Sequence, residues 1–192
     1  MTVSDVGPPP PRLRELATRL DVPPGFRVEV LGGAIVISPI PPKKHGGSLR
    51  RLHDQLSPRL PDGRVALRVC SVEAVEGEDY ASPDLLVTTI EVEDEEGWLV
   101  SPEAVDAVVE VVSPGNATTD LTVKPTLYSR WGIPIYLVID PRHGTLRLYW
   151  DPQDGEYRAK HDTTFAQGVE LPEPLKGVVL DTADLPRYGV RR

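Results

Sequence analysis

Residues 107–140 read AVVEVVSPGNATTDLTVKPTLYSRWGIPIYLVID, and this stretch carries the clearest structural pattern of the chain. Its first part, 107–112, is apolar and β-branched, which is typical of a central strand covered on both faces. The N-cap residue types at 118–120 predict a helix over about 121–131. A second apolar run, 135–139, predicts another buried strand. A strand, a helix and a strand in this order predict an α/β protein.

The other elements follow from apolar periodicity and from turn residues. Helices are expected over 13–20 and about 45–60, and strands over 26–31, 34–38, 64–74, 80–89, 145–150 and 157–162. Gly32 and Gly33 predict a two-residue hairpin turn between the first two strands. The simplest arrangement is one mixed β-sheet flanked by helices, with an N-terminal helix and β-hairpin in front of it.

The 192 residues fit one domain, which we place at 12–186, between a proline-rich, disordered lead-in (1–11) and a tail (187–192). The segment 171–186 is expected to pack along the surface. The single cysteine, Cys70, cannot form an internal disulfide. The first residues given lack the apolar region of a signal peptide, and the sequence contains no apolar run near the ~20 residues of a membrane span and no phosphate-loop or dinucleotide motif. These features predict a cytoplasmic protein with no membrane partner and no organic cofactor.

Charge is unevenly distributed along the chain, whose net charge is −8. Residues 43–68 hold seven Lys or Arg against two acids, whereas residues 69–123 hold fourteen Asp or Glu and no Lys or Arg. One interpretation is a basic helix that pairs with acidic strands and loops across the surface. The other is a basic rim beside an acidic, cation-binding cleft. The composition alone does not choose between them.

Two acidic residues stand in or beside apolar strands, where an ionised carboxylate is expensive to bury. Glu110 lies among valines within 107–112, and Asp84 follows Pro83 and opens an apolar run. On neighbouring strands, the two would offer oxygen ligands to Mg²⁺ or a similar hard cation. Each also has a simpler interpretation alone, since Glu110 could pair with an arginine on a half-exposed face and Asp84 could cap a turn.

Lys124 follows Asp120 by one helical turn. The two side chains can therefore form an ordinary intrahelical ion pair. Near a bound metal, the same lysine could instead orient a water molecule or stabilise negative charge on a phosphate. Both interpretations stay open at this point.

The order of these motifs resembles the Uma-type family of restriction endonucleases, within the PD-(D/E)XK nuclease superfamily. The similar segments are FRVEVLGGAIVISP (26–39), HGGSLRRLHDQL (45–56), ASPDLLV (81–87), the stretch 107–141 with the strand pair after it, and KGVVLD (176–181). The superfamily signature is an acid, a second acid and a lysine. Asp84, Glu110 and Lys124 stand at the matching positions, with the lysine supplied from a helix.

The resemblance implies a restriction-endonuclease-like core and hydrolysis of DNA phosphodiester bonds with Mg²⁺ or Mn²⁺. The metal ligands that it implies are Asp84, Glu110 and Glu29. Lys124 is the implied catalytic lysine, and His45, at the start of the basic helix, is a supporting residue. Enzymes that resemble this core often dimerise to meet two strands, so a homodimer is expected.

The basic residues placed to contact nucleic-acid phosphates are Lys43, Lys44, Arg50 and Arg51. Two alternative functions stay open. One is a catalytically inactive nuclease-fold module that binds DNA or a protein, because a fold does not dictate a function. The other is a metal-dependent hydrolase of small phosphate esters, which would need a closed pocket in place of an open groove.

Overall fold

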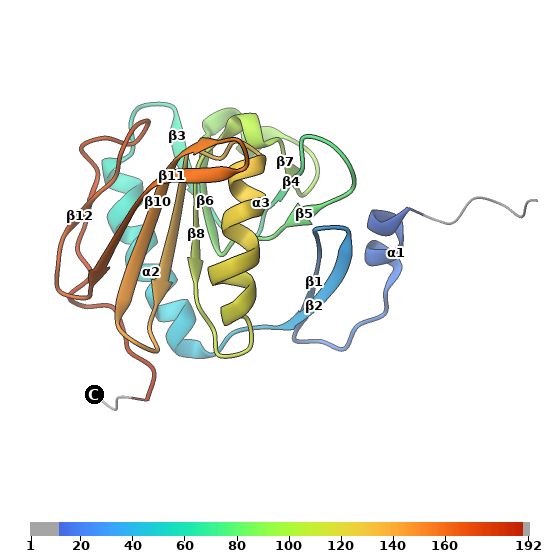
Figure 1. Ribbon diagram of the computed structural model, residues 1–192, viewed down its shortest axis with the longest axis horizontal. Helices are drawn as coiled ribbons and strands as arrows, with labels where there is room; N and C mark the ends of the chain where they lie inside the picture. The colour runs from blue at the N-terminus through green and yellow to red at the C-terminus, as the bar shows by residue number, and fades with distance from the viewer. Residues whose placement is uncertain (1–11, 190–192) are drawn as a thin grey trace, which may run out of the picture.

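The computed structural model describes residues 12–189, so the lead-in predicted for 1–11 and the last residues of the predicted tail lie outside the described residues. Within that range the chain forms a six-stranded, a five-stranded and a two-stranded sheet (Figure 1). The six-stranded sheet has the order β11 (Glu156–Thr164), β10 (Thr145–Gln153), β9 (Ile135–Asp140), β8 (Val105–Val111), β6 (Leu85–Thr89) and β3 (Arg64–Leu67). The five-stranded sheet has the order β2 (Ala34–Pro39), β1 (Phe26–Leu31), β5 (Tyr80–Ala81), β4 (Ser71–Glu73) and β7 (Leu99–Val100). The third pairs β12 (Val169–Glu170) with β13 (Val179–Leu180).

Three α-helices accompany these sheets in the described residues. They are α1 (Leu13–Arg19), α2 (Lys43–Leu56) and α3 (Lys124–Arg130). A π-helical turn, η4 (Thr119–Val123), runs directly into α3, and short 3₁₀ turns form η1 (Ser57–Arg59), η2 (Ile90–Asp94) and η3 (Pro102–Ala104). None of the helices in this range is both long and apolar enough to cross a membrane.

The parallel pair β8–β9 is the centre of the six-stranded sheet, because both strands are buried along almost their whole length. Neighbouring residues of β9 point to opposite faces. Leu137 packs in one core with the leucines of α2, whereas Val138 packs in the other with Leu127 of α3. The helices α2 and α3 therefore cover opposite faces of the sheet (Figure 1), and the predicted α/β class with a helix-flanked mixed sheet is confirmed.

The expectation of one sheet is wrong, because two of the predicted strands change sheet part-way. The predicted strand 64–74 divides into β3 and β4, and Val69 between them has a φ of 81°. The predicted strand 80–89 divides into β5 and β6 at Ser82-Pro83-Asp84. A left-handed β-branched residue and a proline without an N–H group both interrupt a ladder. The second break places Asp84 at the junction of the two large sheets.

The C-terminal segment forms part of the core, where a surface position was expected. Its apolar residues, Leu171, Leu175, Val178, Leu180 and Leu185, are all buried and belong to the same cluster as the α2 leucines. The strand β13 also contacts α2, and the Gln55 side-chain amide donates a hydrogen bond of 2.9 Å to the carbonyl oxygen of Asp181. The segment therefore closes the α2 side of the sheet.

Adjacent positions in β13 test this assignment. Leu180 is fully buried and Val179 is 47% exposed. We expect Leu180→Ala to lower the free energy of unfolding by about 2–5 kcal/mol, because the truncation leaves a cavity in the core. We expect Val179→Ala to stay within about 0.5 kcal/mol of wild type. Urea unfolding of the two variants measures both values, and equal small losses would place the segment outside the core.

Candidate active site

Asp84 and Glu110 are brought together by the pairing of β6 with β8. Leu85 pairs with Val109 in antiparallel register, and continuing that register by one residue sets Asp84 beside Glu110. The backbone N–H of Val111 donates a hydrogen bond of 2.8 Å to Asp84 Oδ2. The Glu110 side chain is fully buried, and that of Asp84 is 5% exposed. The two predicted carboxylates therefore share one site.

Lys124 enters this site from the first turn of α3. Its Nζ donates a hydrogen bond of 2.6 Å to Glu110 Oε1 and lies 3.2 Å from Glu29 Oε1 and 3.6 Å from Asp120 Oδ1. Tyr128, one turn further on, donates a hydrogen bond of 3.0 Å to the same oxygen of Glu110. The intrahelical Lys124–Asp120 pair is thus present, but the shorter contacts of Lys124 are with the two carboxylates on strands.

The strand β1 supplies a second pair of charged groups, because alternate residues of a strand point to one face. Glu29 Oε1 accepts a hydrogen bond of 2.9 Å from the backbone N–H of Ser82. Arg27, two residues earlier, lies 3.4 Å from Asp84 Oδ1 through its Nη1 and donates a hydrogen bond of 3.0 Å to the carbonyl oxygen of Ser82. On the other side of Asp84, the Nε2 atom of His45 lies 3.0 Å from Oδ2.

We call this group of four carboxylates and three basic side chains the buried charge cluster; its members are Arg27, Glu29, His45, Asp84, Glu110, Asp120 and Lys124. With every carboxylate ionised, the four acids exceed the two permanent cations, Arg27 and Lys124, by two charges. Two buried carboxylate oxygens of the cluster, Glu110 Oε2 and Asp120 Oδ1, accept no hydrogen bond. The cluster is therefore short of positive charge.

Burial is the largest influence on the pKa values in the cluster, and the neighbouring charges oppose or add to it. Burial raises the pKa of Glu110 well above its ordinary value, and the nearby Lys124 offsets the rise only in part. Burial likewise raises the pKa of Asp120 to about 6. For Asp84, burial is outweighed by the combined effect of His45, Arg27 and the hydrogen bond from the Val111 N–H, and its pKa is lowered. Burial lowers the pKa of Lys124, but the surrounding carboxylates, Glu110 first, raise it above its ordinary value, so the lysine stays charged.

Asp84 is the carboxylate of the cluster that faces an open cavity. A cleft of about 550 Å³, which we call the Asp84 cleft, is lined by residues that include Arg27, Lys43, His45, Arg68, Ser82 and Asp84. Glu110 and Lys124 do not line it, and each has a side chain no more than 1% exposed. The site therefore has an accessible part around Asp84 and a sealed part behind it.

The residues of the cluster fit a hard divalent cation of the Mg²⁺ type. Among residues 12–189, no three His, Cys, Asp or Glu side chains converge closely enough to hold a metal without further ligands. Mg²⁺, however, is usually bound by one or two carboxylates together with water and substrate phosphate. Asp84 and the unpaired oxygen of Glu110 match that donor set, and the excess of negative charge in the cluster favours a cation.

Sequence reasoning identified most of this site. Asp84, Glu110, Lys124, Glu29 and His45 all meet in the structure. The interpretation of Glu110 as a half-exposed partner of an arginine is wrong, since its side chain is fully buried against a lysine.

Arg27 was missed. The signal that could have found it is its place two residues before Glu29 on the same face of an alternating strand.

The predicted phosphate-contacting residues do not form one surface. Lys43 lines the Asp84 cleft, and it also lines a separate groove together with Lys44 and Arg51. Arg50 is exposed and forms an ion pair with Asp54, one turn along α2. Only Lys43 of these four residues therefore reaches the cleft of Asp84.

The raised pKa of Asp120 makes the stability of the protein depend on pH. The folded-state value of about 6 exceeds the ordinary 3.8, so protonation of this carboxyl favours the folded state. Its contribution is complete below about pH 4 and is lost as the pH rises through 6. Relative to Asp120→Asn, we expect wild type to lose about 2 kcal/mol of unfolding free energy between pH 4 and pH 7. Urea titrations at several pH values measure this loss. The control is Asp62→Asn, because Asp62 is exposed and lies outside the cluster. If the unfolding free energies of wild type and Asp120→Asn changed in parallel with pH, the assignment would be contradicted.

None of the curated proteins matches this chain. A solved structure, the "putative nuclease belonging to DUF820 from Anabaena variabilis ATCC 29413", superposes with a TM-score of 0.67 at 19% sequence identity. The match covers 84% of this chain and 90% of that one, which shows a shared fold. A family model described as "Putative restriction endonuclease" matches residues 13–183, and the chain therefore belongs to this family, Uma2.

Proposed function

We propose that the protein is a metal-dependent endonuclease that hydrolyses phosphodiester bonds of DNA. The observation that carries the proposal is the placement of Asp84 at an open cleft, in register with a buried Glu110 whose second oxygen has no hydrogen-bond partner. Membership of a family of nuclease-like proteins supports the same class of reaction. The charge shortage of the cluster supports the need for a cation.

In this proposal, five residues of the cluster have defined tasks. Asp84 and Glu110 hold Mg²⁺ or Mn²⁺, and Glu29 supports them through its contact with Lys124. When bound, such an ion neutralises charge on the phosphate and lowers the pKa of a coordinated water. Lys124, which is sealed from the cleft, acts as a positioning residue by fixing Glu110. His45 orients Asp84.

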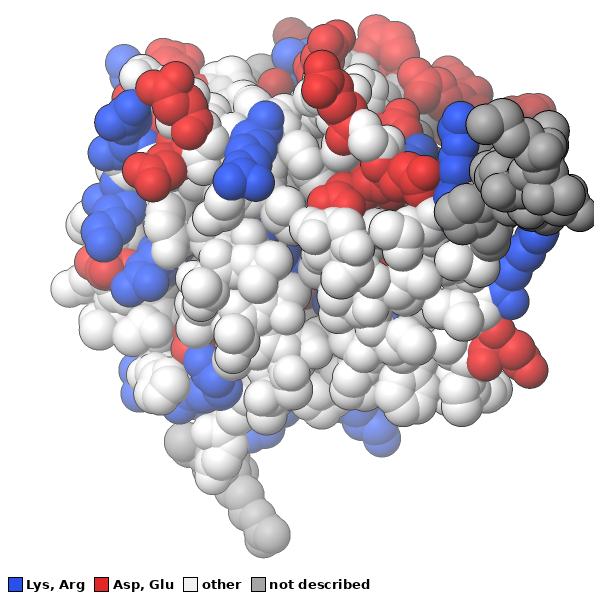
Figure 2. Space-filling view, turned by 45° about the vertical axis from the view of Figure 1, so that its right-hand side comes forward, with Lys and Arg blue, Asp and Glu red and all other residues white. Residues whose placement is uncertain are grey.

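The cleft also presents positive charge to a substrate. Lys43, Arg68 and Arg27 line it beside Asp84, where they would face the phosphates of a nucleic-acid strand. On the face drawn in Figure 2, acidic side chains gather along the upper edge and a large uncharged area lies below them. We therefore propose that DNA approaches through the Asp84 cleft, and that two copies of the chain associate as a homodimer to meet two strands.

Substitution of each of the two proposed metal-binding carboxylates tests this function. We expect Asp84→Asn and Glu110→Gln each to abolish Mg²⁺ binding in calorimetry and to lower plasmid cleavage by about 10²–10³-fold or more, because each removes a ligand charge at nearly constant volume. The matched control is Asp106→Asn, an acid on the same strand as Glu110 that pairs with Arg64 outside the cluster. The control should bind metal and cleave as wild type does.

Two results would overturn the proposal. One is cleavage by Asp84→Asn at the wild-type rate. The other is a folded wild-type protein that neither binds Mg²⁺ nor cleaves DNA when the metal and a duplex are supplied together.

A second candidate function is a binding module that keeps the nuclease fold without turnover. The complete burial of Lys124 and Glu110, and their hydrogen bond to each other, favour it, because a sealed ion pair suits a structural role. The same experiments, together with a measurement of DNA binding, separate the two functions. DNA binding that persists in Asp84→Asn, with neither metal binding nor cleavage in wild type, would support the binding module.

A further inference from the structure

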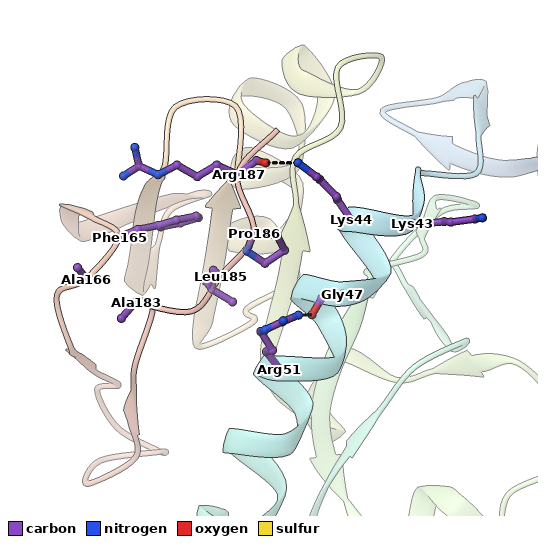
Figure 3. A pocket seen from close by; sticks show the side chains of 10 residues that line it. All are labelled: Lys43, Lys44, Gly47, Arg51, Phe165, Ala166, Ala183, Leu185, Pro186 and Arg187. Atoms are coloured by element: carbon purple, nitrogen blue, oxygen red, sulfur yellow. Dashed lines mark hydrogen bonds between the residues drawn. The ribbon is translucent and has the colours of Figure 1, made fainter. Parts of the chain in front are cut away.

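A second cavity, of about 710 Å³, lies between α2 and the C-terminal segment. We call it the tail groove; it is lined by Lys43, Lys44, Gly47 and Arg51 from α2, by Phe165 and Ala166 after β11, and by Ala183, Leu185, Pro186 and Arg187 from the C-terminal segment (Figure 3). Its volume is within the range of about 300–1,000 Å³ that is usual for small-ligand sites. The tail groove is thus large enough for a nucleotide-sized ligand.

The side chains that line the groove favour an anion. Four of them are Lys or Arg, and none is Asp or Glu. The nearest depression along α2, which also involves Arg51, does contain two acids, Asp54 and Asp184, so the cationic stretch ends there. A ligand that fits the groove must therefore place its negative charge toward the N-terminal half of α2.

The opposite wall of the groove is apolar and aromatic. Phe165 and Leu185 are largely buried, with 7% and 4% exposure, and Pro186 lies between Leu185 and α2 (Figure 3). The guanidinium carbon of Arg187 lies 5.7 Å from the centre of the Phe165 ring. Aromatic rings and guanidinium planes are the surfaces on which unpaired bases stack. The groove therefore combines a cationic wall with a surface suited to a planar ring.

The C-terminal wall is held in place by the rest of the fold. The Nζ atom of Lys44 donates a hydrogen bond of 2.8 Å to the carbonyl oxygen of Arg187 (Figure 3). The backbone N–H of Tyr188 donates one of 2.9 Å to the carbonyl oxygen of Pro141. Gly144 leaves room for the Arg187 side chain, since a β-carbon there would collide with the guanidinium group. The wall is thus formed without a ligand.

Lys43 joins the groove to the Asp84 cleft, because it lines both cavities. Figure 3 shows its side chain pointing away from Phe165, on the far side of the first turn of α2. We propose that the tail groove binds one unpaired nucleotide of the nucleic-acid strand whose backbone passes the Asp84 cleft. The base stacks at Arg187 and Phe165, and the phosphate lies beside Lys44 and Arg51. The inference rests on the proposed function for the identity of the strand.

The test measures binding without cleavage. Fluorescence anisotropy of the full chain in EDTA compares labelled dT12 with a 12-nucleotide abasic strand that carries the same phosphates. We expect dT12 to bind wild type about tenfold more tightly, because only it can stack a base. Arg187→Gln and Phe165→Leu should remove most of that advantage. Arg51→Gln should weaken both strands alike and lower the slope of log K against log salt by about 1.

Arg158→Gln is the control, because this exposed residue pairs with Asp154 on the β10–β11 hairpin and should bind as wild type does. Equal affinity of wild type for dT12 and the abasic strand would overturn the inference and leave a groove that binds anions by charge alone. Unchanged binding by Arg51→Gln and Arg187→Gln would overturn it as well. If Phe165→Leu shows no folding transition in a thermal melt, the Arg187→Gln variant alone tests base stacking, because Arg187 is exposed and its substitution should not disturb the fold. A protein that binds as predicted but never cleaves DNA would refute the proposed function and not the groove.

Discussion

The hydrogen bond from Lys124 to Glu110 is the interaction on which the rest of the site depends. Both side chains lie at the centre of the molecule with no meaningful contact with solvent. A single charge in such a place costs several kcal/mol unless its partner is present. The helix α3 and the strand β8 must therefore be in their native positions together, and Glu29 brings β1 to the same point. The buried ammonium group of Lys124 thus joins both large sheets to the helix.

This arrangement also explains why the site has two parts. Burial raises the pKa of Glu110 and Asp120, Lys124 offsets the rise only in part, and an oxygen of Glu110 is left without a hydrogen bond. Asp84, at the break between β5 and β6, extends the same cluster to the Asp84 cleft. A divalent cation at that boundary would supply the missing charge. The chemistry that we propose is a consequence of the charge balance of the cluster as much as of any single residue.

The sequence predicted the centre of the fold better than its edges. The runs around Glu110 and Val138 are so apolar that only buried strands suit them, and both strands are present. The division of the strands at Val69 and Pro83 depends on local backbone geometry that alternation does not reveal. The burial of Lys124 could not be predicted either, because a lysine at the start of a helix is exposed in most contexts. It is buried here because Glu29 and Glu110, from distant strands, converge on it together with the nearby Asp120.

A double-mutant cycle on the buried pair tests the central claim most directly. Free energies of unfolding would be measured at pH 7 for wild type, Lys124→Met, Glu110→Gln and the double variant. Each single change should cost about 3–5 kcal/mol, because it leaves a buried group without its partner, and the double variant should recover part of the summed loss. A coupling energy of about 1–3 kcal/mol is the predicted result. Losses that add in the double variant would contradict the account, because the two residues would then act independently.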